Sequence, residues 1–348
     1  MAREPIIATG STGPEDEHFN TALRPHALDE CIGSPELIEK LRIAITAARQ
    51  RSEPMEHVML HGPPGLGKTT LAYVIAHEMD TTIKVTSGPA LTRPSDLIGI
   101  LTNLDAGDVL FIDEIHRLAA AVEEYIYPAM EDFKVDFVVD SGMHSRAINL
   151  PLKPFTLIGA TTRAGMLSPP LRTRFGIAHH LEFWSDDDLA RRARMTADML
   201  KIAYDADAIV TIARRARGTP RIANRLVRRC RDYAQVKADG RLTVDAVDAA
   251  LELEGIDQLG LDDLDRKFLR VIIDTYRGGP VGIEAVAATL GEEVDTLVDV
   301  VEPFLLQRAL LARTRRGRSV TLKAYTHLDL APPAGGDADT PLLDDRSA

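Results

Sequence analysis

The chain has 348 residues, of which 45% are hydrophobic and 27% are charged. This composition is typical of globular proteins and excludes a fibrous or wholly disordered chain, while the length exceeds what one hydrophobic core usually supports, so we expect several domains. The net charge of −11 does not exclude a nucleic-acid partner, because Ala208–Arg231 has eight arginines and no acid, and Leu305–Lys323 has five arginines, one lysine and no acid.

The two ends of the chain, residues 1–20 and 331–348, are rich in Gly, Pro, Ser, Thr and acidic residues and have no apolar periodicity. This composition predicts disordered tails. The sequence has neither the roughly 18 to 20 consecutive apolar residues of a membrane span nor the apolar core of a signal peptide, so we expect a cytoplasmic protein without a membrane partner. Cys31 and Cys230 are too few for a disulfide framework or a zinc site and are expected to be reduced and structural.

Residues 21–184 alternate short apolar runs with longer helical patterns. Five runs are strand candidates, namely HVMLHG from His57, TIKVTS from Thr82, DVLFID from Asp108, FTLIGATT from Phe155 and HHLEF from His179. Strands that alternate with helices predict an α/β domain built on a parallel sheet with helical crossovers.

The first of these runs leads into the strongest motif of the sequence, Gly62–Thr70, which fits G-x-x-x-x-G-K-[ST] between a strand and a helix. Its glycines allow consecutive backbone N–H groups to face phosphates, and the helix N-terminus adds positive potential. Lys68 is expected to reach the outer phosphates and Thr69 to ligate magnesium. The motif therefore predicts a site for ATP and Mg²⁺.

Val109–Glu114 is an apolar strand that ends in two carboxylates. Hydrolysis needs an oxygen ligand in the magnesium shell and a group that orients the attacking water, so we assign the first role to Asp113 and the second to Glu114. A lone Asp-Glu pair would also suit a solvated turn, but the phosphate loop upstream favours the catalytic interpretation. His116, at a helix start, is given no role.

Two later segments supply weaker candidates. Ile158–Arg163 ends an apolar strand with hydroxyl side chains, where a residue that senses the γ-phosphate would lie. An arginine in Leu171–Phe175 could reach the nucleotide of a neighbouring subunit, since a guanidinium matches developing phosphoryl charge. Arg221 follows a Gly-Thr-Pro turn and is placed to touch the nucleotide from the helical unit. Alone, either arginine would fit a surface ion pair better.

Beyond residue 184 the character of the sequence changes. Residues 185–256 show Arg- and Ala-rich helical periodicity, which predicts an all-helical second unit. Within residues 257–330, a helix candidate (DDLDRKFLRVIIDTY, from Asp262) and two further helical patterns precede LLARTRRGRSVTLKAY, from Leu310, which indicates two strands joined by a basic turn. Helices followed by such a hairpin predict a winged helix, a relative of the helix-turn-helix.

From about Leu23 to His327 the sequence resembles the RuvB family of AAA+ ATPases. The strings that carry the resemblance are HGPPGLGKTTLA, VLFIDEIHRL, YPAMEDF, FTLIGATTRAG, SPPLRTRFGI, RRARGTPRIANRL and GGPVG. The resemblance implies a AAA+ core over residues 21–184, a helical lid over 185–256 and a winged-helix DNA-binding domain over 257–330. It also implies an ATP-hydrolysing homo-hexameric ring that drives branch migration on the duplex arms of Holliday junctions during homologous recombination and DNA repair, with RuvA and the RuvC resolvase as partners.

Residue by residue, the resemblance implies nucleotide contacts at Leu23, Arg24, Gly65, Lys68, Thr69, Thr70, Glu131, Asp132, Phe133, Arg174, Trp184 and Arg221. It implies that Thr162 is the sensor, that the hairpin over residues 133–150 docks on RuvA, and that Arg313 and Arg318 contact DNA. Two positions depart from the family. Trp184 stands where tyrosine is usual, which puts a hydroxyl contact to the nucleotide in doubt. Val294 stands where a DNA-contacting arginine is common, and one phosphate contact fewer lowers the salt dependence of binding by about one unit at most.

Three other functions remain as alternatives. A protein-remodelling AAA+ ATPase would generally carry an aromatic pore residue in Ala90–Leu110, where this sequence has none. A clamp-loader subunit would leave the basic hairpin near the C-terminus unexplained. An ATP-dependent switch or scaffold without turnover is disfavoured because Asp113 and Glu114 are both present, with Arg174 in place.

Overall fold

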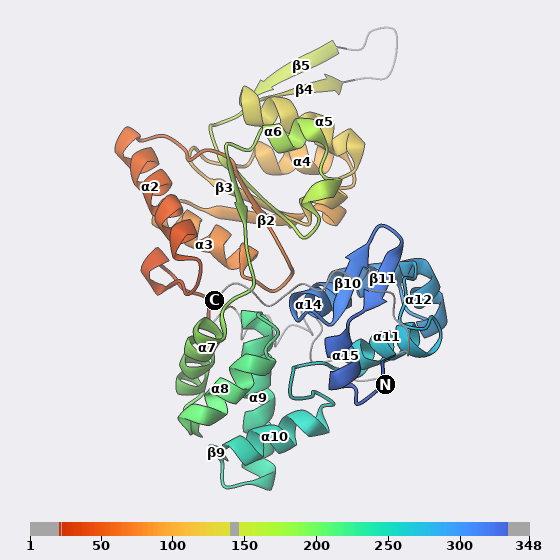
Figure 1. The fold of residues 1–348 in the computed structure, drawn as a ribbon. Helices are drawn as coiled ribbons and strands as arrows, with labels where there is room; N and C mark the ends of the chain where they lie inside the picture. The colour runs from red at the N-terminus through yellow and green to blue at the C-terminus, as the bar shows by residue number, and fades with distance from the viewer. Residues whose placement is uncertain (1–20, 22, 140–145, 333–348) are drawn as a thin grey trace. The chain divides into compact units, whose positions relative to one another are not determined.

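The computed structural model describes residue 21, residues 23–139 and residues 146–332 (Figure 1). The tails predicted at the two ends, apart from residues 331 and 332, lie outside the described residues. The chain divides into two compact units, Met1–Glu254 and Gly255–Ala348, and each is described by itself. Among the described residues, no helix is both long and apolar enough to cross a membrane.

The first unit contains a five-stranded sheet whose strand pairs are all parallel. Its order is β2-β3-β6-β1-β7. The strands are β1 (Val58–His61), β2 (Ile83–Ser87), β3 (Val109–Asp113), β6 (Thr156–Thr161) and β7 (Ile177–His180). All five predicted strands are confirmed, but β7 starts earlier and ends earlier than HHLEF. The strand ends early because its partner β1 ends at His61. The hydrogen bond from Leu181 N to His61 O, 2.7 Å, is the last that pairing with β1 allows.

Helices cover both faces of this sheet. The helices of the domain are α2 (Pro35–Arg51), α3 (Lys68–Glu78), α4 (Pro94–Leu101), α5 (Ala120–Glu131) and α6 (Pro169–Thr173), with short 3-10 turns at Leu28–Glu30, Gly88–Ala90, Ile115–Arg117 and Ala164–Met166. Alternate strand residues point to opposite cores: Val58 and Leu60 pack with α2 and α3, whereas Met59 packs with α4 and α5. Burial on both faces explains why the three inner strands, β1, β3 and β6, are largely continuous apolar runs, whereas the edge strands β2 and β7 are partly exposed.

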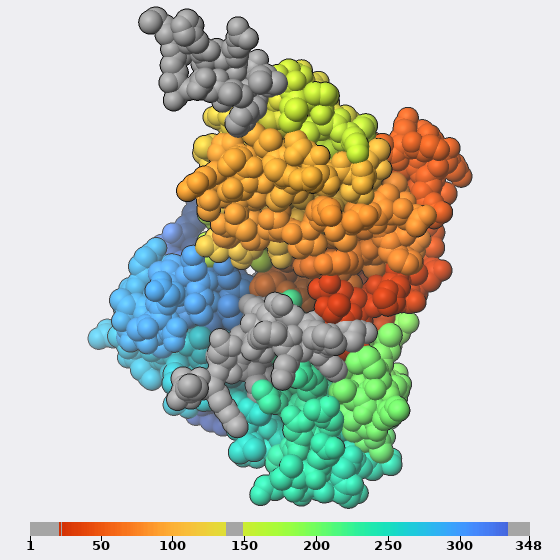
Figure 2. Space-filling model, turned by 180° about the vertical axis from the view of Figure 1, so that it is seen from behind, coloured from red at the N-terminus to blue at the C-terminus, as the bar shows by residue number. Residues whose placement is uncertain are grey.

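The predicted hairpin is confirmed as β4 (Lys134–Val139) and β5 (Arg146–Pro151), which pair antiparallel with Lys134 opposite Pro151. Residues 140–145, between the two strands, lie outside the described residues. Figure 1 shows the hairpin extending beyond α5 and α6, away from the sheet. In Figure 2 the yellow-green residues, which include β5, lie at the edge of the orange surface of the core domain. The hairpin therefore protrudes from the core domain.

The lid follows Ser185, whose hydroxyl accepts from Asp188 N and caps its first helix. Its helices are α7 (Asp186–Met199), α8 (Ala206–Arg215), α9 (Pro220–Lys237) and α10 (Val244–Leu253). The prediction of an all-helical unit was wrong in one detail, because β8 (Ala203–Tyr204) and β9 (Arg241–Leu242) form a two-residue parallel pair. The loops that precede α8 and α10 lie together there, joined by an ion pair between Arg241 and Asp205.

The arginine run of the lid does not form one basic surface. Three of its eight arginines, Arg215, Arg217 and Arg225, are buried. Arg215 pairs with Asp248 on α10 at 2.6 Å. A count of arginines along the sequence therefore overstates the positive charge that this helical unit offers to solvent.

The second unit has the fold of a winged helix. Its elements are α11 (Asp263–Asp274), α12 (Ile283–Leu290), α13 (Val294–Thr296), a π-helical turn (Leu297–Val301), α14 (Glu302–Gln307), β10 (Leu311–Thr314), β11 (Gly317–Val320) and α15 (Leu322–His327). The predicted two-stranded hairpin is confirmed, with Arg313 opposite Arg318. A bridge between Val281 and Arg318 attaches a third segment to it.

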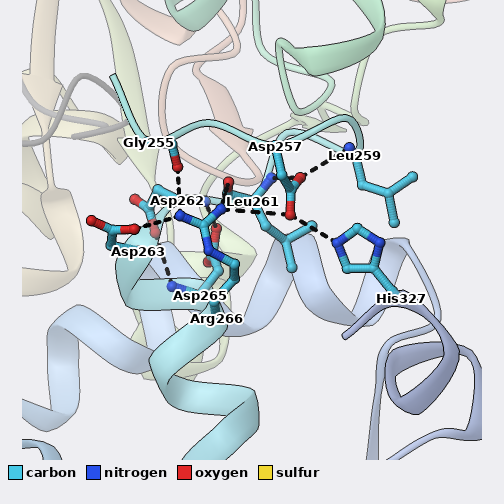
Figure 3. A network of polar contacts seen from close by, with 9 residues as sticks. All are labelled: Gly255, Asp257, Leu259, Leu261, Asp262, Asp263, Asp265, Arg266 and His327. Atoms are coloured by element: carbon cyan, nitrogen blue, oxygen red, sulfur yellow. Dashed lines mark hydrogen bonds and ion pairs between the residues drawn. The ribbon is translucent and has the colours of Figure 1, made fainter. Parts of the chain in front are cut away.

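A polar network fixes the loop that opens this unit (Figure 3). Arg266 of α11 donates to Leu261 O at 2.9 Å and to Gly255 O at 2.7 Å, and its guanidinium also pairs with Asp263. Asp257 accepts from His327 Nε2 of α15 at 2.8 Å. Because both ends of the loop are tied to helices of the winged helix, the loop is part of that unit.

Candidate functional site

The phosphate loop joins β1 to α3 and has the backbone that its glycines permit. Gly65 and Gly67 have φ values of 79° and 95°, in the left-handed region that side chains disfavour. A Cβ on Gly65 would also lie 2.6 Å from Thr219 Cγ2 of the lid. Gly67 caps α3, whose first residue is Lys68. The unpaired N–H groups of this helix end form an anion site.

Lys68 is buried at the centre of this loop. Its Nζ donates to Gly62 O and Pro63 O, both at 2.8 Å. Burial lowers the pKa of Lys68 to about 8, while Asp113 opposes this shift and Arg221 adds to it. A buried ammonium held by two carbonyl groups would gain a stronger partner in a phosphate oxygen, since charge-assisted bonds are roughly twice as strong as neutral ones.

These groups line a pocket of about 430 Å³ between the core and the lid. The predicted site residues that line it are Arg24, Gly65, Lys68, Thr69, Thr70, Asp113, Glu114, Thr162, Trp184 and Arg221. The structure thus brings ten of the predicted residues to one cavity. A hydroxyl on Thr69 and a carboxylate on Asp113 are oxygen donors of the kind that magnesium prefers, so the cavity fits a magnesium-bound triphosphate.

The two carboxylates follow β3 directly. Asp113 Oδ1 accepts from Glu114 N at 2.9 Å, which fixes the strand end. Glu114 has a φ of 48°, and its carboxylate pairs with Arg117 at 3.0 Å. This pair is about half exposed, with side-chain exposures of 45% and 58%. Exposed ion pairs of this kind contribute little, so Glu114 can leave Arg117 for a water molecule at low cost.

The end of β6 carries a contact that the sequence analysis missed. The buried hydroxyl of Thr161 lies 2.9 Å from His116 Nδ1 and accepts from Arg163 N at 2.9 Å. His116, to which the sequence gave no role, therefore links the turn after β3 to the strand end that carries Thr162. The position of His116 two residues after Glu114 was the only sign in the sequence that it lies near the site. The sequence could not show that its partner is Thr161 on β6.

The lid closes one side of the pocket with α7 and the start of α9. Arg221 lies in the first turn of α9, beside Asn224. Arg192 of α7 donates to Asn224 Oδ1 and to Leu23 O, both at 3.1 Å. Arg192 and Asn224 line the pocket but were not predicted. Leu23 itself is buried and does not line the pocket; its carbonyl group anchors the lid instead.

An aromatic and apolar wall forms the other end of the pocket. Trp184 lies against Gly33, where a Cβ would be 3.4 Å from the indole Cε2. Ile32, Ile38 and Leu181 line the same cavity. The guanidinium of Arg24 is held 4.5 Å from the Tyr73 ring centroid. An apolar wall with an aromatic face is suited to a nucleotide base, and the indole supplies that face without a phenol hydroxyl.

Besides Leu23, four other predicted nucleotide contacts do not line the pocket, and these four form a second cluster at the end of α5. Arg174 Nη2 pairs with Glu131 at 3.0 Å, and Nη1 donates to Pro170 O at 2.7 Å. Asp132 pairs with Lys134 at 2.7 Å. Phe133 packs on Phe155, with ring centroids 5.8 Å apart. These residues belong to a different surface of the same core domain.

The two predicted DNA contacts differ in exposure. Arg313 is exposed on β10, as are Arg315 and Arg316 in the following turn. Arg318 is 11% exposed, and its Nε and Nη2 bind Glu302, which is 2% exposed. The basic surface of the hairpin is therefore made by Arg313 and the turn, while Arg318 is largely taken up by a buried ion pair.

Comparison with known proteins places every domain in one family. Residues 23–181 match the family described as Holliday junction DNA helicase RuvB P-loop domain, residues 184–257 the RuvB AAA lid domain, and residues 258–329 the RuvB C-terminal winged helix domain. The chain is 58% identical over 307 residues to the Holliday junction branch migration complex subunit RuvB of Desulfosudis oleivorans, covering 88% of this chain and 90% of that protein.

Solved structures agree with this assignment. The Holliday junction branch migration motor RuvB of Thermotoga maritima is 52% identical, with a TM-score of 0.82 over 89% of this chain and 99% of that one. A substituted form of the same protein is 51% identical, with a TM-score of 0.84 over 90% of this chain and 100% of that one. The three-part architecture predicted from the sequence is confirmed.

Proposed function

Since the chain belongs to the RuvB family, we propose that it hydrolyses ATP to drive branch migration of Holliday junctions in homologous recombination and DNA repair. The observation that carries the proposal is the single pocket that joins the phosphate loop, the two carboxylates after β3 and Arg221 of the lid. Membership in this family disfavours the clamp-loader and protein-remodelling alternatives.

The pocket residues divide the chemistry among them. Lys68 and the N–H groups at the start of α3 hold the phosphates, and Thr69 and Asp113 would hold Mg²⁺, which neutralises phosphate charge. Glu114 orients and polarises the attacking water once it has left Arg117, and Thr162 senses the γ-phosphate. Arg221 reports the state of the nucleotide to the lid, since it lies in α9.

We further propose that hydrolysis needs a neighbouring subunit. Arg174 does not line the pocket of its own chain, so it can serve a nucleotide only across a boundary between copies. Glu131, Asp132 and Phe133 lie in the same cluster and would contribute to the same boundary. An arginine supplied in this way can raise the rate by about 10³ to 10⁵. A closed homo-hexameric ring provides such a boundary for each subunit.

The winged helix would hold the duplex through its phosphates. Arg313 is exposed and free of the ion pair that holds Arg318. We propose Arg313 as the direct contact and Arg318 as a weaker one, since Glu302 leaves only its Nη1 to reach a phosphate. Backbone contacts are independent of sequence, as a motor on any duplex requires. Loss of the γ-phosphate would reorient the lid, and rigid-body rotation would carry the winged helix and its DNA.

The protruding β4–β5 hairpin is the proposed docking site for RuvA, with RuvC joining a larger complex. The test of the function is ATP-dependent dissociation of a synthetic four-way junction, with and without RuvA. We expect dissociation that depends on ATP and is stimulated by RuvA. A forked duplex is the control, because unwinding of the fork at the same rate would indicate a general helicase and contradict the proposal.

A further inference from the structure

The guanidinium of Arg174 rests on an aromatic ring that the proposed mechanism has not used. Its Cζ lies 4.4 Å from the centroid of the Tyr127 ring. The Arg174 side chain is 21% exposed, and its Nε is buried with no hydrogen-bond partner among the described residues. The arginine is thus held mainly by its flat face and by its two terminal nitrogens.

The Tyr127 hydroxyl is itself held by two side chains, one on its own helix α5 and one at the start of α6. Its hydroxyl donates to Glu123 Oε1 at 2.5 Å, one turn earlier on α5, and lies 3.2 Å from Ser168 Oγ. Ser168 also bonds to Glu123, and its hydroxyl caps α6, the short helix that Arg174 follows. The ring and the arginine backbone are therefore fixed by one network of side chains.

An aromatic ring can hold a guanidinium without offsetting its charge, which a carboxylate cannot do. Glu131 also orients Arg174, but it is an anion that offsets the charge of the guanidinium, and it is 54% exposed. The Tyr127 ring attracts the cation through its quadrupole and consumes no N–H donor. It therefore fixes the plane of the guanidinium without using the N–H donors or offsetting the charge that a phosphate would bind. Fixing the plane in advance also lowers the conformational entropy that a long side chain loses on binding.

We propose that Tyr127 is a positioning residue that holds Arg174 in the orientation needed to reach the nucleotide of the neighbouring protomer. The inference rests on the proposed function, because it assumes that Arg174 acts across a subunit boundary. Tyr127 does not line the pocket of its own chain, which the phosphate loop helps to form. Its removal is thus expected to lower kcat without changing how the same protomer binds ATP.

The first experiment compares Tyr127→Leu with Tyr127→Phe in steady-state ATP hydrolysis. A cation–π contact of about 1 to 2 kcal/mol corresponds to a loss of roughly 5- to 30-fold in kcat for the leucine variant, with KM unchanged. The phenylalanine variant keeps the ring and is expected to retain most of the activity. Tyr125→Leu, the same change two residues away on α5, is the matched control and is expected to keep wild-type kcat. A rise in KM with unchanged kcat, or equal losses in the leucine and phenylalanine variants, would overturn the inference.

A mixing experiment separates Tyr127 from the function on which it rests. Lys68→Ala protomers lack the lysine proposed to hold the phosphates but carry an intact Arg174, so in mixed rings they can serve the intact pocket of a Tyr127→Leu protomer. We expect the mixture to exceed the summed activities of the two variants, as should a mixture of Lys68→Ala with Arg174→Ala. If ATP hydrolysis recovers in the mixture with Arg174→Ala but not in the mixture with Tyr127→Leu, the role of Tyr127 is overturned and the proposed function stands. No recovery in either mixture would overturn the arrangement across subunits and the inference with it.

Discussion

Raising the pH is expected to weaken ATP binding, because the phosphate-loop lysine loses its charge in a range where most lysines keep it. Burial lowers the pKa of Lys68 to about 8. Within the part of the chain that the structure describes, its Nζ donates to the carbonyl groups of Gly62 and Pro63. Since a triphosphate favours the protonated form, bound nucleotide raises this pKa again. Affinity is therefore full below about pH 8 and falls as the pH rises through that value.

The size of the effect follows from the two protonation equilibria. If the bound lysine regains the pKa of a free lysine, the Kd for ATP rises roughly 25-fold between about pH 7 and about pH 9.5. Two neighbouring groups titrate outside this window. Burial is the main cause that lowers the pKa of His61, and the charge of the neighbouring His180 lowers it further. Burial raises the pKa of the Cys31 thiol to about 11. A phosphate group with a last pKa of about 6 is already mostly ionised at about pH 7, so the nucleotide adds little to the change across the window.

The assay is equilibrium binding of a non-hydrolysable ATP analogue with Mg²⁺ across this pH range. Lys68→Arg is the matched control, because a guanidinium stays charged and its binding curve is expected to be flat, whatever its absolute affinity. A flat curve for the wild-type chain would refute the depressed pKa of Lys68. An equal slope in the arginine variant would show that another group titrates.

Two further predictions concern the carboxylates. Glu114→Gln is expected to bind ATP with nearly wild-type Kd but to lower kcat by at least about 100-fold, since it removes the group that polarises water. The two quantities are measured by phosphate release and by equilibrium binding. Wild-type turnover in this variant would exclude Glu114 as the group that activates water. Glu302→Ala leaves the Arg318 guanidinium buried without its carboxylate partner. The variant is expected to lower the free energy of unfolding of the winged helix by about 3 kcal/mol in urea unfolding. A decrease no larger than that of the exposed control Glu293→Ala would argue against a stabilising role of the buried pair.

The core and its nucleotide loop could be predicted from the sequence because their signals are local. A strand that is buried on both faces must be apolar along its whole length, and a loop that cradles phosphates needs glycines at fixed spacing. The positions of Lys68, Asp113 and Glu114 follow from these two constraints. The basic turn between β10 and β11 was visible for a similar reason, since hairpin strands and turn residues lie together in the chain.

Other features depend on partners that are distant in the sequence. Arg192 lines the pocket and bonds Leu23 O and Asn224, and His116 of the turn after β3 bonds Thr161 at the end of β6. Arg318 was predicted as a DNA contact, but its pairing with Glu302 depends on how α14 packs against the hairpin. A residue's type shows which bonds it can make, and only the fold decides whether its partner is solvent, a ligand or a buried carboxylate.

The central claim is that ATP held by one protomer is cleaved with the help of Arg174 from the next. Measuring ATP turnover per protomer as a function of protein concentration tests it most directly, with Arg174→Ala measured in parallel. We expect wild-type turnover to rise steeply as monomers assemble, and the variant to assemble equally while its turnover stays at the monomer level. Full turnover by dilute wild-type monomers, or by assembled Arg174→Ala rings, would contradict the claim.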